Sequence, residues 1–338
     1  VDAADYPRHG SREEQLRFLL GYAVLAPSGH NTQPWRFRIA DGTVRLYADR
    51  DRRLPVVDPD DRELIISCGA ALFHLRLALR YFGHRDTVRP FPDPADPDLL
   101  AEVVPGDAAA PDATDRALFA AIPRRFTHRG PVRDTPVPPE LRHLLDWLVE
   151  REGAHLACLA EPAAKDAVAE LVAEGDRTQA ADPAFRRELA GWVRPNPTRR
   201  GDGIPGYAFG VGTPASLVGP WFLRWTNWGA GQAARDRRLA AEAPALGLLS
   251  TVRDGRDCWL AAGQALAALL LRAAEDGVQA AYLNQPIEVA ALRPRLAEAA
   301  GVGGHPQVLL RLGYPRAGRR PTPRRPVADV TDERSARS

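Results

Sequence analysis

The segment DDRELIISCGAALFHLRLALRYFG, residues 60–83, decides the fold because a second part of the chain repeats its pattern. Shifted by 194 positions, it meets DGRDCWLAAGQALAALLLRAAEDG, residues 254–277, and eight of the 24 residues coincide. Both segments have the composition of long apolar helices. The coincidences include two pairs of glycines with the same spacing, Gly69 with Gly263 and Gly83 with Gly277. The sequence therefore predicts two similar α+β halves, a fused duplication.

Shorter patterns around these segments predict the remaining elements. Ser11 and Glu14 form a capping box for a helix that runs to about residue 25, and residues 35–48 alternate around an Asp-Gly pair as a β-hairpin does. Residues 92–114, rich in Pro and Asp, are expected to be a linker around an edge strand. We expect a first half at 1–108 and a second at 109–338. Further helices are predicted at 114–123, 139–152 and 163–175, and a buried strand at 307–315.

Composition excludes several classes of protein. The net charge of +2 over 338 residues gives no strong basic field, so no nucleic-acid partner is expected. The three cysteines lie far apart in the sequence and are expected to be reduced thiols. The histidines do not occur in pairs with the spacing of metal ligands, so no metal site is expected. No apolar run approaches a membrane span, and the first residues, VDAADYPRHG, lack the apolar core of a signal peptide. These observations predict a cytoplasmic protein with no membrane partner.

The stretch APSGHNTQPW, residues 26–35, places many hydrogen-bonding side chains directly after a helix. One interpretation is a polar loop whose Ser and Asn satisfy their own backbone. The other is that its side chains and amides bind the polar edge of a flat ligand. On composition alone the first is favoured. The candidate residues are Pro27, Ser28, Gly29, His30 and Asn31.

Two arginine-rich segments have the composition of phosphate-binding sites. In PRRFTHR, residues 123–129, three arginines flank Thr127, and guanidinium groups bind phosphate through paired hydrogen bonds. A solvated basic surface explains the same composition equally well. RRPTPRR, residues 319–325, is either a disordered basic tail or a second set of phosphate ligands.

GDGIPG, residues 201–206, matches the dinucleotide-binding pattern but follows PNPTRR rather than a strand. We reject it as such a site and interpret residues 191–220 as a flap with glycine hinges. The chain shows no recognisable nucleophile or acid–base pair. This absence predicts that a cofactor carries the chemistry and that no side chain acts as a catalyst.

Taken together, APSGHNTQPW, RRFTHR (124–129) and GYPRAGRRPTPRRPVADV (313–330) resemble the FMN-dependent nitroreductase superfamily, in its Acg-like branch with two fused halves. The resemblance implies a flavin-ring loop at Pro27, Ser28 and Asn31. It implies a phosphate motif at Arg125, Thr127 and Arg129, with Arg324 or Arg325 as a further ligand. Asn284 and Gln285 occupy the place of groups that face the reactive nitrogen of the flavin, although the usual Glu-Gly is missing there.

The resemblance also implies an activity. FMN would take hydride from NAD(P)H and pass it to a flat small molecule such as a nitroaromatic, a quinone or a secondary metabolite. A single chain would complete the site, with a homodimer as a further arrangement. The alternative is an FMN-sequestering protein with a closed flap and little reductase activity.

Overall fold

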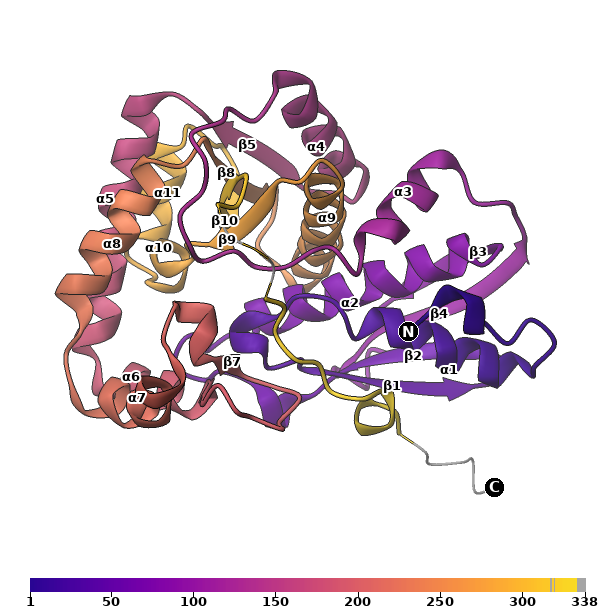
Figure 1. The fold of residues 1–338 in the computed structure, drawn as a ribbon. Coiled ribbons are helices and arrows are strands. Elements are labelled where there is room, and N and C mark those ends of the chain that lie inside the picture. The colour runs from indigo at the N-terminus through magenta and orange to yellow at the C-terminus, as the bar shows by residue number, and fades with distance from the viewer. Residues whose placement is uncertain (317, 319, 333–338) are drawn as a thin grey trace.

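The chain folds into two halves that each contain a four-stranded antiparallel sheet (Figure 1). The computed structural model describes residues 1–316, 318 and 320–332. In the first sheet the spatial order is β1 (Trp35–Ala40), β2 (Thr43–Ala48), β4 (Leu99–Ala108), β3 (His84–Pro90). In the second it is β5 (His155–Leu159), β8 (Ala245–Thr251), β10 (His305–Gly313), β9 (Gln279–Tyr282). Counted within each half, the strand order is the same, which confirms the predicted α+β duplication.

The two repeated segments form helices α2 (Arg62–Tyr81) and α9 (Arg256–Glu275), which pack against each other in the centre of the protein. Gly69 and Gly263 face each other where the helices cross. A Cβ added to Gly69 would overlap the carbonyl oxygen of Leu260, and one added to Gly263 would overlap that of Ile66. Gly83 and Gly277 follow the two helices with φ of 92° and 78°, a conformation that glycine adopts most readily. The repeated glycines thus mark one helix crossing and two helix ends.

Helix α1 (Arg12–Ala23) begins at the predicted capping box, and α3 (Ala113–Ala121) and α4 (Pro139–Arg151) lie near their predicted positions. The expectation of a linker around an edge strand at 92–114 is wrong, because β4 lies inside the sheet between β2 and β3. The prolines are tolerated because three of them precede the strand, while Pro105 pairs beside a register shift opposite β3. The boundary at 108/109 stays a prediction.

An insertion distinguishes the second half from the first. Residues 160–244 separate β5 from β8, whereas the equivalent strands β1 and β2 are joined by the turn Asp41-Gly42. The irregular stretch expected at 191–220 is irregular only in part, and α8 was not predicted. The insertion contains α5 (Pro162–Ala181), α6 (Pro183–Trp192), β6 (Val193–Arg194), β7 (Ile204–Pro205), α7 (Thr213–Trp225) and α8 (Gly229–Ala241). Two short helices, α10 (Gln285–Glu288) and α11 (Arg293–Ala299), connect β9 to β10.

The segment after β10 crosses to the first half, where its last described residues lie beside β1 (Figure 1). Thr331 pairs with Phe37 there, and the Asp332 amide donates to the Phe37 carbonyl at 2.9 Å. Helix α2, contrary to expectation, is long and apolar enough to cross a membrane. However, 83% of its apolar 18-residue segment is buried inside the protein. Its apolar side chains belong to the core on which both halves pack.

Candidate functional site

A cavity of about 230 Å³ lies where residues of both halves meet. The first half contributes the loop after α1, and the second contributes α5, β9, α10 and the segment after β10. Apolar side chains such as Phe185, Leu189 and Leu266 form part of the wall. Ten of the twelve predicted site residues line it: Pro27, Ser28, Gly29, His30, Asn31, Thr127, Arg129, Asn284, Gln285 and Arg324.

The loop 27–33 holds an unusual backbone conformation. His30, Asn31 and Gln33 have φ of 48°, 55° and 54°. These values lie in the left-handed region, which residues other than glycine rarely adopt. The Ser28 hydroxyl accepts from the Gln33 amide at 3.0 Å, so Ser28 satisfies the loop backbone as the first interpretation expected. The Asn31 amide group donates to the Gly203 and Pro323 carbonyls at 2.9 and 3.1 Å. Strain of this kind persists where neighbouring contacts fix it, and it is common at functional sites.

Two arginines from different parts of the chain converge beside this loop. Arg125, which is 8% exposed, and Arg324 both donate to the carbonyl oxygen of Leu25, at 3.4 and 3.3 Å. The other acceptors of Arg324 are also uncharged: they belong to Asn31, Thr322 and Pro323. Like charges brought together away from water are unfavourable unless an anion joins them.

Buried donors without acceptors surround the same point. In the described part of the chain, Arg129 Nη1, Arg324 Nε and the Tyr282 hydroxyl are shielded from solvent and have no hydrogen-bond partner. Burial and the charge of Arg125 lower the pKa of Arg324 to about 9, and burial raises the pKa of Tyr282 to about 12. Burial and Arg129 lower the pKa of His30 to about 4. An anion with several oxygen atoms fits this set of donors.

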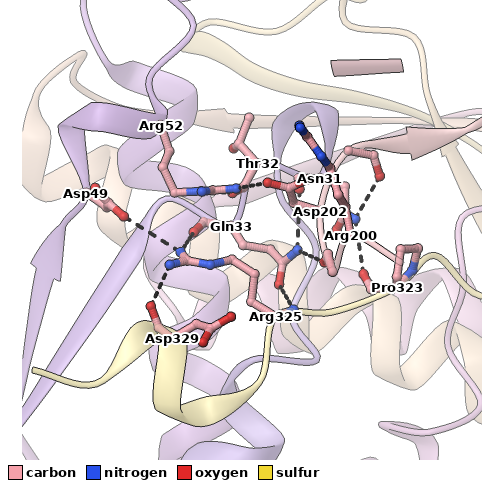
Figure 2. Close-up of polar contacts among 12 residues, drawn as sticks. Asn31, Thr32, Gln33, Asp49, Arg52, Arg200, Asp202, Pro323, Arg325 and Asp329 are labelled. Carbon is pink, nitrogen blue, oxygen red and sulfur yellow. Dashed lines mark hydrogen bonds and ion pairs between the residues drawn. The ribbon is translucent and has the colours of Figure 1, made fainter. Parts of the chain in front are cut away.

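Arg325, the neighbour of Arg324, does not line the cavity. Figure 2 shows its polar contacts with Asp49 and Asp329. Its guanidinium group donates to the Asp329 carbonyl and lies 3.7 Å from the Asp49 carboxylate. Its backbone amide donates to the Gln33 side chain at 2.9 Å. The structure therefore brings Arg324 to the cavity and uses Arg325 to attach the C-terminal segment to the first half. Arg125 is not part of the lining either, but it lies behind Arg324 at Leu25.

The flap is attached to the loop at its glycines (Figure 2). The Gln33 side chain donates to the Gly201 carbonyl at 2.7 Å, and the Gly203 amide donates to the Asn31 carbonyl at 3.2 Å. Asp202 forms ion pairs with Arg52 and Arg194. A Cβ on Gly201 would lie 2.7 Å from the Arg324 carbonyl oxygen. These glycines allow the flap, the loop and the C-terminal segment to approach closely, while their role as hinges stays a prediction.

The acidic residues that line the cavity were not predicted from the sequence. Glu63, Asp176 and Glu288 line the cavity, and burial raises the pKa of all three carboxyls, to about 7 for Glu63 and Asp176. Single acidic residues within helical patterns give no signal in a sequence. Tyr282 was also missed, although it lies only two residues before Asn284. Asn284 uses both of its polar atoms within the protein, donating to Glu63 at 3.1 Å and accepting from the Leu309 amide at 3.0 Å.

Fold and site together define a fused two-half protein with a buried set of arginine and tyrosine donors at one cavity. No family model matches the chain. "Putative NAD(P)H nitroreductase Rv3131" of Mycobacterium tuberculosis is 36% identical over 96% of this chain and 93% of its own length. "Putative NAD(P)H nitroreductase acg" of the same organism is 31% identical, with 91% and 92% covered, and "Probable NAD(P)H nitroreductase PigM" of Serratia is 26% identical, with 93% and 92% covered.

The chain belongs to this family of NAD(P)H nitroreductases and is with them an oxidoreductase, which confirms the family predicted from the three motifs. Among solved structures, the FMN and NADPH-dependent nitroreductase NfnB of Sphigopyxis sp. strain HMH is similar over 64% of this chain and 99% of its own. The two are 19% identical with a TM-score of 0.44, too weak a likeness to carry an argument.

Proposed function

We propose that the cavity binds FMN, with the phosphate group held by Arg129, Arg324 and Tyr282. The guanidinium group of Arg324 carries this proposal, because its acceptors among the described residues are all neutral, the Leu25 carbonyl included. A phosphate supplies about two negative charges and several acceptor oxygens, and each hydrogen bond to a charged group is worth roughly 1.5–3 kcal/mol. Thr127 lines the same cavity and adds a hydroxyl donor.

The flat ring system would lie against residues 27–31. The Gln33–Ser28 hydrogen bond holds this loop in one conformation, so its backbone groups need no reorganisation when the ring binds. Asn31 acts here as a support for Arg324 and for the flap, since its amide is engaged with both. Phe185, Leu189 and Leu266 exclude water from the cavity. FMN, when bound, supplies hydride transfer from NAD(P)H to a flat acceptor such as a nitroaromatic or a quinone.

FMN and riboflavin, which lacks the phosphate, test the assignment directly. The wild-type protein should bind FMN much more tightly than riboflavin. Arg324→Gln should weaken FMN binding by about 10- to 100-fold, the loss of one or two charged hydrogen bonds, and leave riboflavin binding nearly unchanged. Arg124→Gln, at an exposed position of the motif that contains Arg125, is the control and should bind FMN as the wild type does. Equal loss in both variants, or no preference for FMN, would contradict the phosphate site.

One observation favours a second function, FMN sequestration. The flap is attached at Gly201 and Gly203 to the loop that would face the ring. An anaerobic visible spectrum of the FMN-loaded protein, taken before and after addition of NADPH, separates the two. Loss of the flavin band identifies a reductase, whereas a persistent band identifies a shielded ring. We further propose that one chain suffices for the site, because both of its halves line the cavity; the cytoplasmic location stays a prediction.

A further inference from the structure

The wall of the cavity formed by α5 and α10 carries an unsatisfied carboxylate. Asp176, on α5, lines the cavity and is 4% exposed. Its Oδ1 accepts from the Gln285 side chain at 3.1 Å, but its Oδ2 has no hydrogen-bond partner among the described residues. Within the same part of the chain, Asp176 forms no ion pair. A buried carboxylate oxygen without a donor is costly, so a ligand with a donor group would be stabilised there.

A second carboxylate increases the negative charge at this wall. Asp236, on α8, accepts from the same Gln285 nitrogen at 3.3 Å and from Gln232 at 2.8 Å. One amide nitrogen therefore serves two acidic side chains. Gln285 Oε1 is itself buried and without a described partner, which places a further free acceptor beside Asp176. Two adjacent acceptors with no donor favour a group that offers several N–H bonds.

Arg129, Arg235 and Arg311 act electrostatically on Asp236, but among the described residues no arginine forms an ion pair with Asp176 or Asp236. Arg177 is exposed on the outer face of α5. Arg235 donates to the Arg129 carbonyl, and Arg311 donates to the His128 and Gly130 carbonyls. The adjacent cavity surface is apolar and aromatic, with Phe185, Leu189 and Trp228. This combination suits a flat molecule whose charged end is a cation, because aromatic rings also attract cations.

We propose that Asp176 and Gln285 bind an amino or ammonium group, so that the acceptor reduced by this protein is a flat molecule that carries an amine. This inference rests on the proposed function for the flat acceptor, but not for the amine itself. The cavity then has two ends of opposite preference: the arginine end takes the phosphate anion, and the Asp176 end takes the cation. Recognition of the amine gives specificity, because a ligand without it leaves the carboxylate unpaired.

Two probes that differ in one group test the proposal: 4-nitrobenzylamine and 4-nitrobenzyl alcohol. Their dissociation constants are measured at pH 8 on the oxidised, FMN-loaded protein, without NAD(P)H, from the change in flavin absorbance. The amine should bind at least about tenfold more tightly than the alcohol, as one hydrogen-bonded charge pair predicts. Asp176→Asn should abolish this preference. Asp166→Asn, the same substitution at an exposed position of α5, should preserve it.

Equal binding of the two probes, or an undiminished preference in Asp176→Asn, would overturn the proposal. Loss of FMN from Asp176→Asn would do so as well, since the carboxylate would then serve the cofactor. Gln285→Met, which removes the neighbouring acceptor, should weaken the preference and serves if Asp176→Asn does not fold. If the wild type binds no FMN, the proposed function fails. The same titration, followed by tryptophan fluorescence, then still tests the amine site, because Trp228 lines the cavity.

Discussion

Arg125 and Arg324 lie in distant parts of the sequence, yet their guanidinium groups donate to one acceptor, the carbonyl oxygen of Leu25. Their mutual repulsion is part of the reason why the pKa of Arg324 falls to about 9. The folded protein therefore contains a repulsion that an anion relieves.

FMN should accordingly stabilise the protein against heat. At a concentration 100 times its dissociation constant, a ligand that binds only the folded state contributes about 2.7 kcal/mol, which corresponds to a rise in Tm of roughly 4 °C for a chain of this size. Differential scanning calorimetry measures this shift. Arg324→Gln should show a smaller rise at the same FMN concentration, whereas Arg124→Gln should match the wild type. A rise unaffected by Arg324→Gln would place the phosphate elsewhere.

The crossing of α2 and α9 should tolerate no side chain. Gly69→Ala or Gly263→Ala places a Cβ against a backbone carbonyl, so the helices must move apart. We expect a loss of about 3 kcal/mol or more in the free energy of unfolding, measured in urea. Gly231→Ala, in α8, is the control, because a Cβ there meets no atom within 4 Å. That variant should be unchanged or more stable by about 0.5–1 kcal/mol. Equal effects at the two kinds of site would contradict the close crossing.

Stability should depend on pH through Asp176. Burial and the neighbouring Asp236 raise its pKa to about 7 from the ordinary 3.8. A raised pKa means that the folded state holds the proton more tightly than the unfolded chain does. The resulting stabilisation is complete below about pH 4 and is lost as the pH rises through 7. Without ligand, Asp176→Asn should therefore be more stable than the wild type at pH 8, by up to a few kcal/mol.

The advantage of Asp176→Asn should shrink at pH 5, where the wild-type carboxyl retains most of its proton. Urea unfolding at both pH values measures it, and Asp166→Asn should show no such difference. Glu63 and Glu288 act in the same direction, so part of the pH dependence should remain in Asp176→Asn. A variant less stable than the wild type at pH 8 would refute the assignment of this pKa.

The attachment of the flap should control the release of FMN. Gln33 joins the flap to the C-terminal segment, since it donates to the Gly201 carbonyl and accepts from the Arg325 amide. Gln33→Leu should release FMN about tenfold faster, because two partly buried backbone groups, the Gly201 carbonyl and the Arg325 amide, lose their partners. Recovery of flavin fluorescence after dilution measures the rate. Arg199→Gln, at an exposed position of the same flap, should behave as the wild type does.

The repeat and the helix cap could be predicted from the sequence because each is visible in a continuous segment of the chain. Gly69 and Gly263 could be aligned because the two 24-residue segments share identical residues at a constant offset. The Ser11 capping box is a local pattern. Helix α8 was missed because its buried residues, among them Ala233 and Leu239, give no clear apolar period. Strand β4 was expected as an edge strand within a linker, because the prolines before it resemble those of a linker, and its place inside the sheet was missed.

The site was predictable only where charge or turn chemistry is concentrated. The loop 27–31 and the arginine motifs are dense enough to be seen. The choice between Arg324 and Arg325 depends on which side of the C-terminal segment faces the cavity, and only the fold determines that. Asp176 and Tyr282 are ordinary residues until distant elements bury them.

The crossing at Gly69 and Gly263 has a consequence for the evolution of the protein. In a dimer of identical chains, every substitution is made twice, once on each side of the symmetry axis. Here the two contact glycines are separate codons, and a substitution reaches one half alone. One half can thus have a two-residue turn, Asp41-Gly42, at the place where the other has residues 160–244. Substitutions can therefore change the cavity from one half without a matching change in the other half.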